Sequence, residues 1–303
     1  KGEKISGVLS LDRLGAKGMF LGMLVAFLAA EIYCWATKKG WQIKMPDSVP
    51  PAVAKSFAAL IPAVLTLSIF LFVNAGLTGF FNANLHDIIY KVIQTPLVGL
   101  GSSIWATLVA IFFVQFLWFF GLHGQILVNS VMDPIWNTLM LDNLEAYQAG
   151  KHLPHIISKS FMETFTVGLG GSGMTLAVVI IMAFILKKKM YKDVGRLALG
   201  AGLFNVNEPV IFGLPIVLNA TILIPWVLAP IVVTAFNYTV MAVGIVPAPT
   251  GVAVPWTVPV FFSGMLATNS ILGGVLQLVD MVIVGLIWYP FLRMLDKQPD
   301  SVL

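Results

Sequence analysis

The longest uncharged stretch of the chain limits what the chain can fold into. From Val210 to Val279 there is no Asp, Glu, Lys or Arg, and the stretch from Val92 to Met132 is equally free of them. A water-soluble protein can bury one such stretch in its core but not several. Over the whole chain 58% of residues are hydrophobic and 11% are charged, against about 45–50% and about 25% in soluble domains. The sequence therefore predicts an all-α polytopic membrane protein.

Stretches of about twenty apolar residues, the length of a bilayer-crossing helix, recur along the chain. We expect membrane spans at 18–36, 57–81, 104–122, 221–246 and 271–292, and a shorter one at 174–186. Two segments that alternate polar and apolar residues in a helical rhythm, 84–95 and 129–147, are predicted to be amphipathic helices at the membrane interface. The proline-containing segment 38–55 is predicted to be a structured loop. Basic residues cluster where spans end, which places those ends in the cytoplasm.

Two apolar stretches are interrupted by residues that break helices. Residues 168–173 read Gly-Leu-Gly-Gly-Ser-Gly, and residues 204–209 read Phe-Asn-Val-Asn-Glu-Pro. Broken backbone at membrane depth is tolerated only where protein or a water-filled cavity covers it. A pair of broken apolar segments is a pointer to the binding site of a transporter. The alternative is that both are ordinary loops outside the bilayer.

Glu208 is the leading candidate for a functional side chain. It is the last charged residue before the uncharged stretch, and an ionisable group inside a membrane protein is costly and marks a functional site by default. Asn205 and Asn207 beside it offer amide donors and acceptors that suit sugar hydroxyls. The alternative is a turn in which the Asn and Glu side chains cap the next helix, with Pro209 at its first position.

His123 and Trp256 are further candidates. His123 ends a long aromatic stretch, where a histidine is commonly a satisfied polar group at a helix end. Together with Glu208 it can instead bind a hydroxyl group or act as a general base. Trp256 lies between two prolines in the uncharged stretch, and its ring can pack against the apolar face of a pyranose or anchor the chain at the membrane interface.

Other sequence features exclude several functions. The net charge of +4 lies at the ends of apolar segments, so it does not indicate nucleic-acid binding. There is no Walker A pattern, so ATP is not expected as the direct energy source, and we expect no metal and no cofactor. Glu31 and Asp280 lie within apolar spans. They are natural proton-coupling residues for a secondary sugar transporter, the alternative function, although we expect both at the interface.

The segment 204–219, Phe-Asn-Val-Asn-Glu-Pro-Val-Ile-Phe-Gly-Leu-Pro-Ile-Val-Leu-Asn, resembles the enzyme IIC component of the lactose/cellobiose/diacetylchitobiose class of the phosphotransferase system. The element Gly121-Leu122-His123-Gly124 and the opening Ser-Leu-Asp-Arg-Leu-Gly-Ala-Lys-Gly at 10–18 fit the same family. The resemblance is nearest to the diacetylchitobiose permeases of Bacillus-like bacteria. In the family, further helices precede the segment that matches 10–18, so we expect this chain to begin partway through the protein.

The resemblance implies a fold with two re-entrant hairpins, near 156–173 and 204–219. It assigns 1–100 to the end of a scaffold and dimerisation domain and 101–303 to a sugar-binding transport domain. It implies that Glu208 and His123 hold and polarise the 6-hydroxyl of a β-linked disaccharide, and that neither is phosphorylated. The implied substrate contacts are those two residues and Asn205, Asn207, Ser172 and Trp256.

The resemblance also implies the partners of the protein. These are a lipid bilayer, a second copy of the chain, the disaccharide, and an enzyme IIB that carries a phosphocysteine, with enzyme IIA and HPr upstream of it. The expected activity is import of the sugar by alternating access, coupled to its phosphorylation by enzyme IIB.

Overall fold

The computed structural model describes residues 18–46, 49–81, 84–214 and 216–297. These residues form helices joined by turns and loops and contain no strand, which confirms the expected all-α class. The chain divides into two compact units, 1–97 and 98–303. Apart from Gly18, the family-like opening at 10–18 lies outside the described residues.

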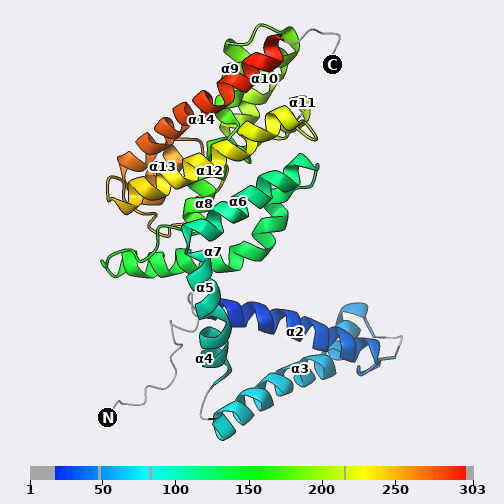
Figure 1. Ribbon diagram of the computed structural model, residues 1–303. Coiled ribbons are helices and arrows are strands. Elements are labelled where there is room, and N and C mark those ends of the chain that lie inside the picture. The colour runs from blue at the N-terminus through cyan, green and yellow to red at the C-terminus, as the bar shows by residue number, and fades with distance from the viewer. Residues whose placement is uncertain (1–17, 47–48, 82–83, 215, 298–303) are drawn as a thin grey trace. The chain divides into compact units, whose positions relative to one another are not determined.

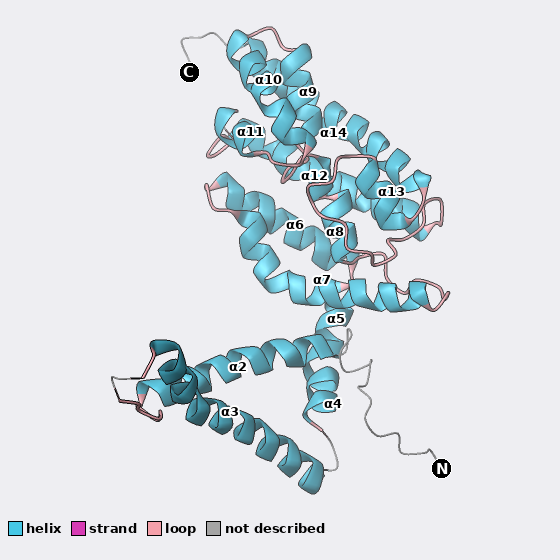
Figure 2. Cartoon of the chain, turned by 180° about the vertical axis from the view of Figure 1, so that it is seen from behind, coloured by secondary structure: helices cyan, strands magenta, loops and turns pink. Residues whose placement is uncertain are grey.

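Unit 1 contains two long apolar helices that pack against each other. Helix α2 (Met19–Lys38) and helix α3 (Pro51–Phe81) come together near the loop between them, as Figures 1 and 2 both show. Helix α3 begins at Pro51, inside the segment expected to be a loop. Proline suits the first turn of a helix, because the N–H that it lacks would have no partner there. The predicted loop is therefore shorter than expected.

The segment predicted as an interfacial helix at 84–95 is helical from Leu85 onward. Helix α4 (Leu85–Ile89) leads through the π-helical turn η2 (Tyr90–Gln94) into α5 (Thr95–Gly101), which crosses the boundary between the two units. The Asn84 side chain caps α4 by accepting a hydrogen bond of 2.9 Å from the backbone N–H of Asp87. Asparagine is among the preferred residues at this position, since its oxygen satisfies a free N–H of the first turn.

Unit 2 is a bundle of long and short helices. In chain order they are α6 (Ile104–Phe119), α7 (Gly124–Gln148), α8 (Lys159–Phe165), the 3₁₀ turn η3 (Val167–Leu169), α9 (Leu176–Phe184), α10 (Lys189–Leu203), α11 (Glu208–Gly213), α12 (Ala220–Ala242), α13 (Phe262–Thr268) and α14 (Ile271–Lys297). The predicted amphipathic segment 129–147 forms the greater part of α7.

The hydrophobic core of unit 2 lies where α14 packs against α9 and α12 (Figure 1). The rings of Trp226 on α12 and Trp288 on α14 meet edge to face, with 6.4 Å between their centroids. The indole N–H of Trp226 donates a hydrogen bond of 3.1 Å to the carbonyl oxygen of Gln115 on α6. A buried indole is costly without such a partner, so this bond also fixes α12 against α6.

Four described helices are long and apolar enough to cross a membrane: α2, α3, α12 and α14. The stretch 85–119 adds a fifth span if its two halves, bent by 77°, are counted as one. The expected span at 174–186 is wrong, because α9 has only nine residues. Most of its side chains are buried in the core of unit 2, so its apolar sequence reflects packing against protein rather than contact with lipid.

Two buried polar side chains of α14 connect it to its neighbours. The Gln277 amide oxygen accepts from the backbone N–H groups of Phe261 and Gly264, at 2.9 and 2.8 Å. Its amide nitrogen donates to the Thr164 carbonyl oxygen at 2.8 Å, so α14, α13 and α8 are held together. One turn further, the Asp280 carboxylate accepts a hydrogen bond of 2.9 Å from the Asn237 amide of α12. The Asp280 side chain is fully buried between helices, so it faces neither lipid nor bulk water.

Candidate functional site

A partly open cavity of about 600 Å³ in unit 2 collects most of the polar side chains that the sequence singled out. Ligand sites in proteins are commonly cavities of about 300–1,000 Å³ with a few placed polar groups. The lining residues come from the end of α6, from α7, α8 and η3, from both broken segments and from the loop between α12 and α13: Trp118, His123, Gln125, Ile126, Asn129, Ser130, Asp133, Lys159, Glu163, Val167, Gly171, Ser172, Asn205, Asn207, Glu208 and Trp256.

The two broken segments are joined by two asparagine side chains. Asn205 accepts a hydrogen bond of 2.7 Å from the backbone N–H of Gly170. Asn207 donates one of 2.6 Å to the carbonyl oxygen of Ser172. Both side chains are buried, and the polar backbone of the glycine-rich turn needs such partners because no regular helix satisfies it there. The interruptions that look independent in the sequence therefore form one structural element.

Glycine is required in this turn for two reasons. Gly171 and Gly173 have φ angles of +81° and +77°, a region that residues with a side chain rarely adopt. A Cβ atom on Gly171 would also lie 2.6 Å from the Asn207 side chain, and one on Gly173 would lie 2.3 Å from the Trp226 ring. The turn can approach Asn207 and the core this closely only because these side chains are absent.

Asn205 also holds the loop that carries Trp256. Its amide nitrogen donates to the carbonyl oxygens of Trp256, at 2.6 Å, and Val258, at 3.1 Å. Both amide hydrogens are thus bound to backbone, so Asn205 orders the wall of the cavity. The Trp256 side chain remains partly exposed and lines the cavity, a placement that allows its ring to stack on a ligand.

His123 occupies the break between α6 and α7. Its Nδ1 accepts a hydrogen bond of 3.3 Å from the backbone N–H of Ile126, so the side chain caps α7. In the neutral ring the proton is then on Nε2, which leaves an N–H donor for a ligand. The ring centroids of His123 and Trp118 are 4.5 Å apart. His123 therefore combines the cap that the sequence suggests with a place on the cavity wall.

Glu208 is the first residue of α11, and its side chain is exposed at the cavity. The residue at the N-cap position is Asn207, whose side chain makes no capping hydrogen bond. It is turned to Ser172 instead. The alternative in which these asparagine and glutamate side chains serve as helix caps is therefore wrong for Asn207. The Glu208 carboxylate is placed where it can accept a hydrogen bond from a bound hydroxyl group.

A second group of charges lies on the wall formed by α7 and α8. The Lys159 ammonium is 2.7 Å from a carboxylate oxygen of Asp133 and 2.7 Å from one of Glu163. Burial lowers the pKa of Lys159, but the charges and hydrogen bonds of Glu163 and Asp133 outweigh burial and raise the pKa above its ordinary value. Lys159 lies in a helix of seven residues, too short to cross a bilayer.

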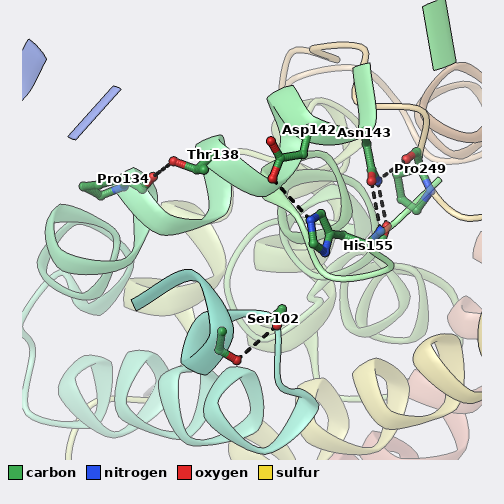
Figure 3. A network of polar contacts seen from close by, with 8 residues as sticks. Ser102, Pro134, Thr138, Asp142, Asn143, His155 and Pro249 are labelled. Carbon is green, nitrogen blue, oxygen red and sulfur yellow. Dashed lines mark hydrogen bonds and ion pairs between the residues drawn. The ribbon is translucent and has the colours of Figure 1, made fainter. Parts of the chain in front are cut away.

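The helix that carries much of this wall is anchored at its far end by Asn143. This buried side chain donates to the carbonyl oxygens of His155 and Pro249, at 2.6 and 2.8 Å, and accepts from the His155 N–H at 3.0 Å (Figure 3). The His155 ring lies 3.3 Å from the Asp142 carboxylate in the same network. Asn143 thereby fixes α7 against two loops that are distant in sequence.

The sequence profile of the family "Phosphotransferase system, EIIC" matches residues 2–230. The oligo-β-mannoside-specific EIIC component of Bacillus subtilis (strain 168) is 62% identical over 296 residues, which cover 98% of this chain and 67% of that protein. The chain belongs to the EIIC family of the phosphotransferase system. It is therefore a multi-pass membrane protein, as its long apolar helices indicate.

Other relatives of this EIIC chain carry names of related sugars. The lichenan permease IIC component of the same bacterium is 41% identical over 295 residues, covering 97% of this chain and 65% of that protein. The crystal structure of the transporter ChbC, the IIC component of an N,N'-diacetylchitobiose-specific phosphotransferase system, matches with a TM-score of 0.92 and 40% identity. That match covers 97% of this chain and 68% of ChbC. The chain thus spans about two thirds of the length of these relatives.

All six predicted site residues line the cavity of this EIIC chain: Glu208, His123, Asn207, Trp256, Ser172 and Asn205. The sequence reasoning missed Trp118, Gln125 and the charged group of Asp133, Lys159 and Glu163. Gln125 accepts a hydrogen bond of 3.2 Å from the Ser172 hydroxyl. The available signal was weak, since Lys159 and Glu163 have only the four-residue spacing of an ordinary helical ion pair.

Proposed function

We propose that this EIIC chain forms the sugar site of a permease that imports a β-linked disaccharide or short oligosaccharide and presents its 6-hydroxyl to a phosphorylated enzyme IIB. One observation carries the proposal: Asn207, Glu208, His123 and Trp256 lie on one cavity although they come from three distant segments. A carboxylate, an amide, an imidazole N–H and an aromatic face are the groups that bind a neutral, hydroxyl-rich ring.

Glu208 and His123 have distinct tasks in this proposal. The Glu208 carboxylate accepts the hydrogen bond of the 6-hydroxyl and takes its proton as the oxygen attacks the donor phosphorus. The P–S bond of the phosphocysteine then breaks, a P–O bond to the sugar forms, and the sulfur leaves as the thiolate of enzyme IIB. The Nε2–H of His123 orients the hydroxyl oxygen, which brings the reacting groups into position.

The substrate class follows from the relatives. Their names include oligo-β-mannoside, lichenan and cellobiose, and the match in solved structures is a diacetylchitobiose transporter. We therefore propose β-mannobiose as the first sugar to test and cellobiose and diacetylchitobiose as the next. These sugars share the β linkage and differ in single substituents of the ring, which a few lining side chains can distinguish.

The decisive experiment uses vesicles that contain the full-length permease, supplied with phosphorylated enzyme IIB and labelled β-mannobiose or cellobiose. We expect the sugar 6-phosphate to form. Replacing Glu208 with Gln is expected to lower its formation about 100-fold or more while the protein stays folded. Wild-type activity of E208Q would end the proposed role of Glu208. Accumulation of unmodified sugar that depends on a proton gradient would replace group translocation with secondary transport.

We also propose that unit 1 provides the contact between two copies of the chain. Its helices leave large apolar side chains exposed, among them Phe27 and Phe72, with 75% and 73% of their surface accessible. Lipid or a second copy covers such side chains in a membrane. The mass of the permease in mild detergent tests this proposal: a dimer is expected, and a stable active monomer would overturn it.

A further inference from the structure

The charged lining of the cavity has an excess of carboxylates. Asp133, Glu163 and Glu208 line it, and Lys159 is the only lysine or arginine among the described lining residues. With His123 neutral, three carboxylates and one ammonium leave a formal charge of −2. A neutral sugar tolerates such a field, since its hydroxyl groups can donate to carboxylates.

The one ammonium group is not available to an anion. Lys159 lies 2.7 Å from an oxygen of each of its two carboxylate partners, and its side chain is 16% exposed. Glu163, one helical turn along α8, is similarly enclosed, with 18% of its side chain accessible. Charges in such partly buried positions are screened by salt much less than charges at the surface. An anionic ligand therefore meets the carboxylates without gaining a free cation.

We propose that Asp133 and Glu163 make the cavity selective for uncharged sugars. They exclude disaccharides that contain a uronic acid, and they weaken binding of the sugar 6-phosphate so that the product leaves once it is made. This inference rests on the proposed function and adds to it the residues that discriminate by charge.

The decisive pair of ligands in the test carries the same phosphorus group and differs in charge, at the cost of two added methyl groups. The full-length permease in detergent is titrated with β-mannobiose or cellobiose, whichever binds, with its 6-phosphate, and with the neutral dimethyl ester of that phosphate. We expect the 6-phosphate to bind about tenfold or more weakly than the neutral ester. In the double variant D133N/E163Q, the difference between the affinities for the 6-phosphate and for the neutral ester is expected to shrink to about threefold or less.

The control variant is E145Q/D193N, which removes the same charge from exposed positions of α7 and α10 outside the cavity. In this control variant, the difference between the affinities for the neutral ester and for the 6-phosphate is expected to stay as in the wild type. If D133N/E163Q does not fold, the single variants D133N and E163Q supply a second reading, because each removes one carboxylate and must bring the affinity for the 6-phosphate part of the way toward that for the neutral ester.

Equal binding of the 6-phosphate and its neutral ester to the wild type would overturn the inference. The inference would also be overturned if a folded D133N/E163Q variant kept the wild-type difference between the affinities for these two ligands. A permease that binds no neutral β-disaccharide at all would instead contradict the proposed function, so the two failures are distinguishable.

Discussion

The Asn207 side chain donates a hydrogen bond of 2.6 Å to the carbonyl oxygen of Ser172, 35 positions earlier in the chain. This bond joins the turn that leads into Glu208, the first residue of α11, to the glycine-rich turn at 168–173. Both partners are buried, so water cannot replace the donor if it is lost. The position of Glu208 on the cavity wall therefore depends on a contact between two segments that each lack regular structure.

Replacing Asn207 with Asp tests this contact. A carboxylate cannot donate to the Ser172 carbonyl and repels it, so the turn should move and sugar binding should weaken about tenfold or more. Equilibrium binding of the labelled disaccharide is the measurement. N219D is the matched control, because Asn219 accepts bonds from Thr221 and Ile222 as a helix cap and Asp caps equally well. Equal effects of the two substitutions would contradict a specific role for Asn207.

Replacing Gly171 with Ala tests the close approach itself. The added Cβ would lie 2.6 Å from the Asn207 side chain, at a backbone φ of +81°. We expect G171A to lower the free energy of unfolding by about 1–3 kcal/mol, seen as a lower thermal midpoint. We expect its affinity for the sugar to fall as well. G200A on α10 is the control, since nothing lies within 4 Å of its Cβ and alanine favours a helix. A tolerated G171A would show that the turn is less constrained than the structure indicates.

A pair of substitutions separates the two roles of His123. Asn keeps the capping acceptor for the Ile126 N–H but is too short to replace Nε2, whereas Gln places a donor near Nε2 and caps less well. We expect H123N to keep its thermal stability and lose sugar phosphorylation about 100-fold or more. H123Q is expected to lose about 1 kcal/mol of stability but to retain more activity than H123N. If activity follows stability in both variants, His123 serves only as a cap.

The buried pair of Asn237 and Asp280 is predicted to be structural. N237L leaves the Asp280 carboxyl without its donor and is expected to lower stability by about 1–3 kcal/mol, read from thermal unfolding in detergent. The double variant N237L/D280L replaces both groups with apolar ones and is expected to recover most of the loss. A double variant less stable than N237L alone would show that Asp280 makes further contacts worth keeping.

Several features of this fold can be predicted from short stretches of sequence. The absence of charge from 92 to 132 and again from 210 to 279 predicts a membrane protein, since a soluble core can hold one such stretch but not several. Glycines and prolines mark the broken segments correctly, because they act through local backbone geometry. The same reasoning failed at 174–186, where apolar residues that pack against α10 and α14 have the same composition as residues that face lipid.

Some residues of the candidate site can be recognised from the neighbouring sequence, whereas others can be recognised only from contacts between segments that are distant in the chain. Glu208 stands out in the sequence because an isolated carboxylate in an apolar chain is costly. Asp133, Lys159 and Glu163 do not stand out, because their chemistry depends on the distance between two helices rather than on spacing within one. Asn143 and Gln277 are likewise ordinary in the sequence. Each holds three segments together only after the chain has folded.

The sequence by itself determined the helical membrane class, the two breaks and the residue types suited to bind a neutral sugar. The tertiary structure alone decided that both breaks and the end of α6 meet on one cavity, and that its single ammonium is held by two carboxylates. The physical reason is the distance along the chain over which each kind of interaction acts. Hydrophobic composition and backbone preference act over a few residues, whereas hydrogen bonds and ion pairs depend on atoms a few ångströms apart that lie tens of residues apart in the chain.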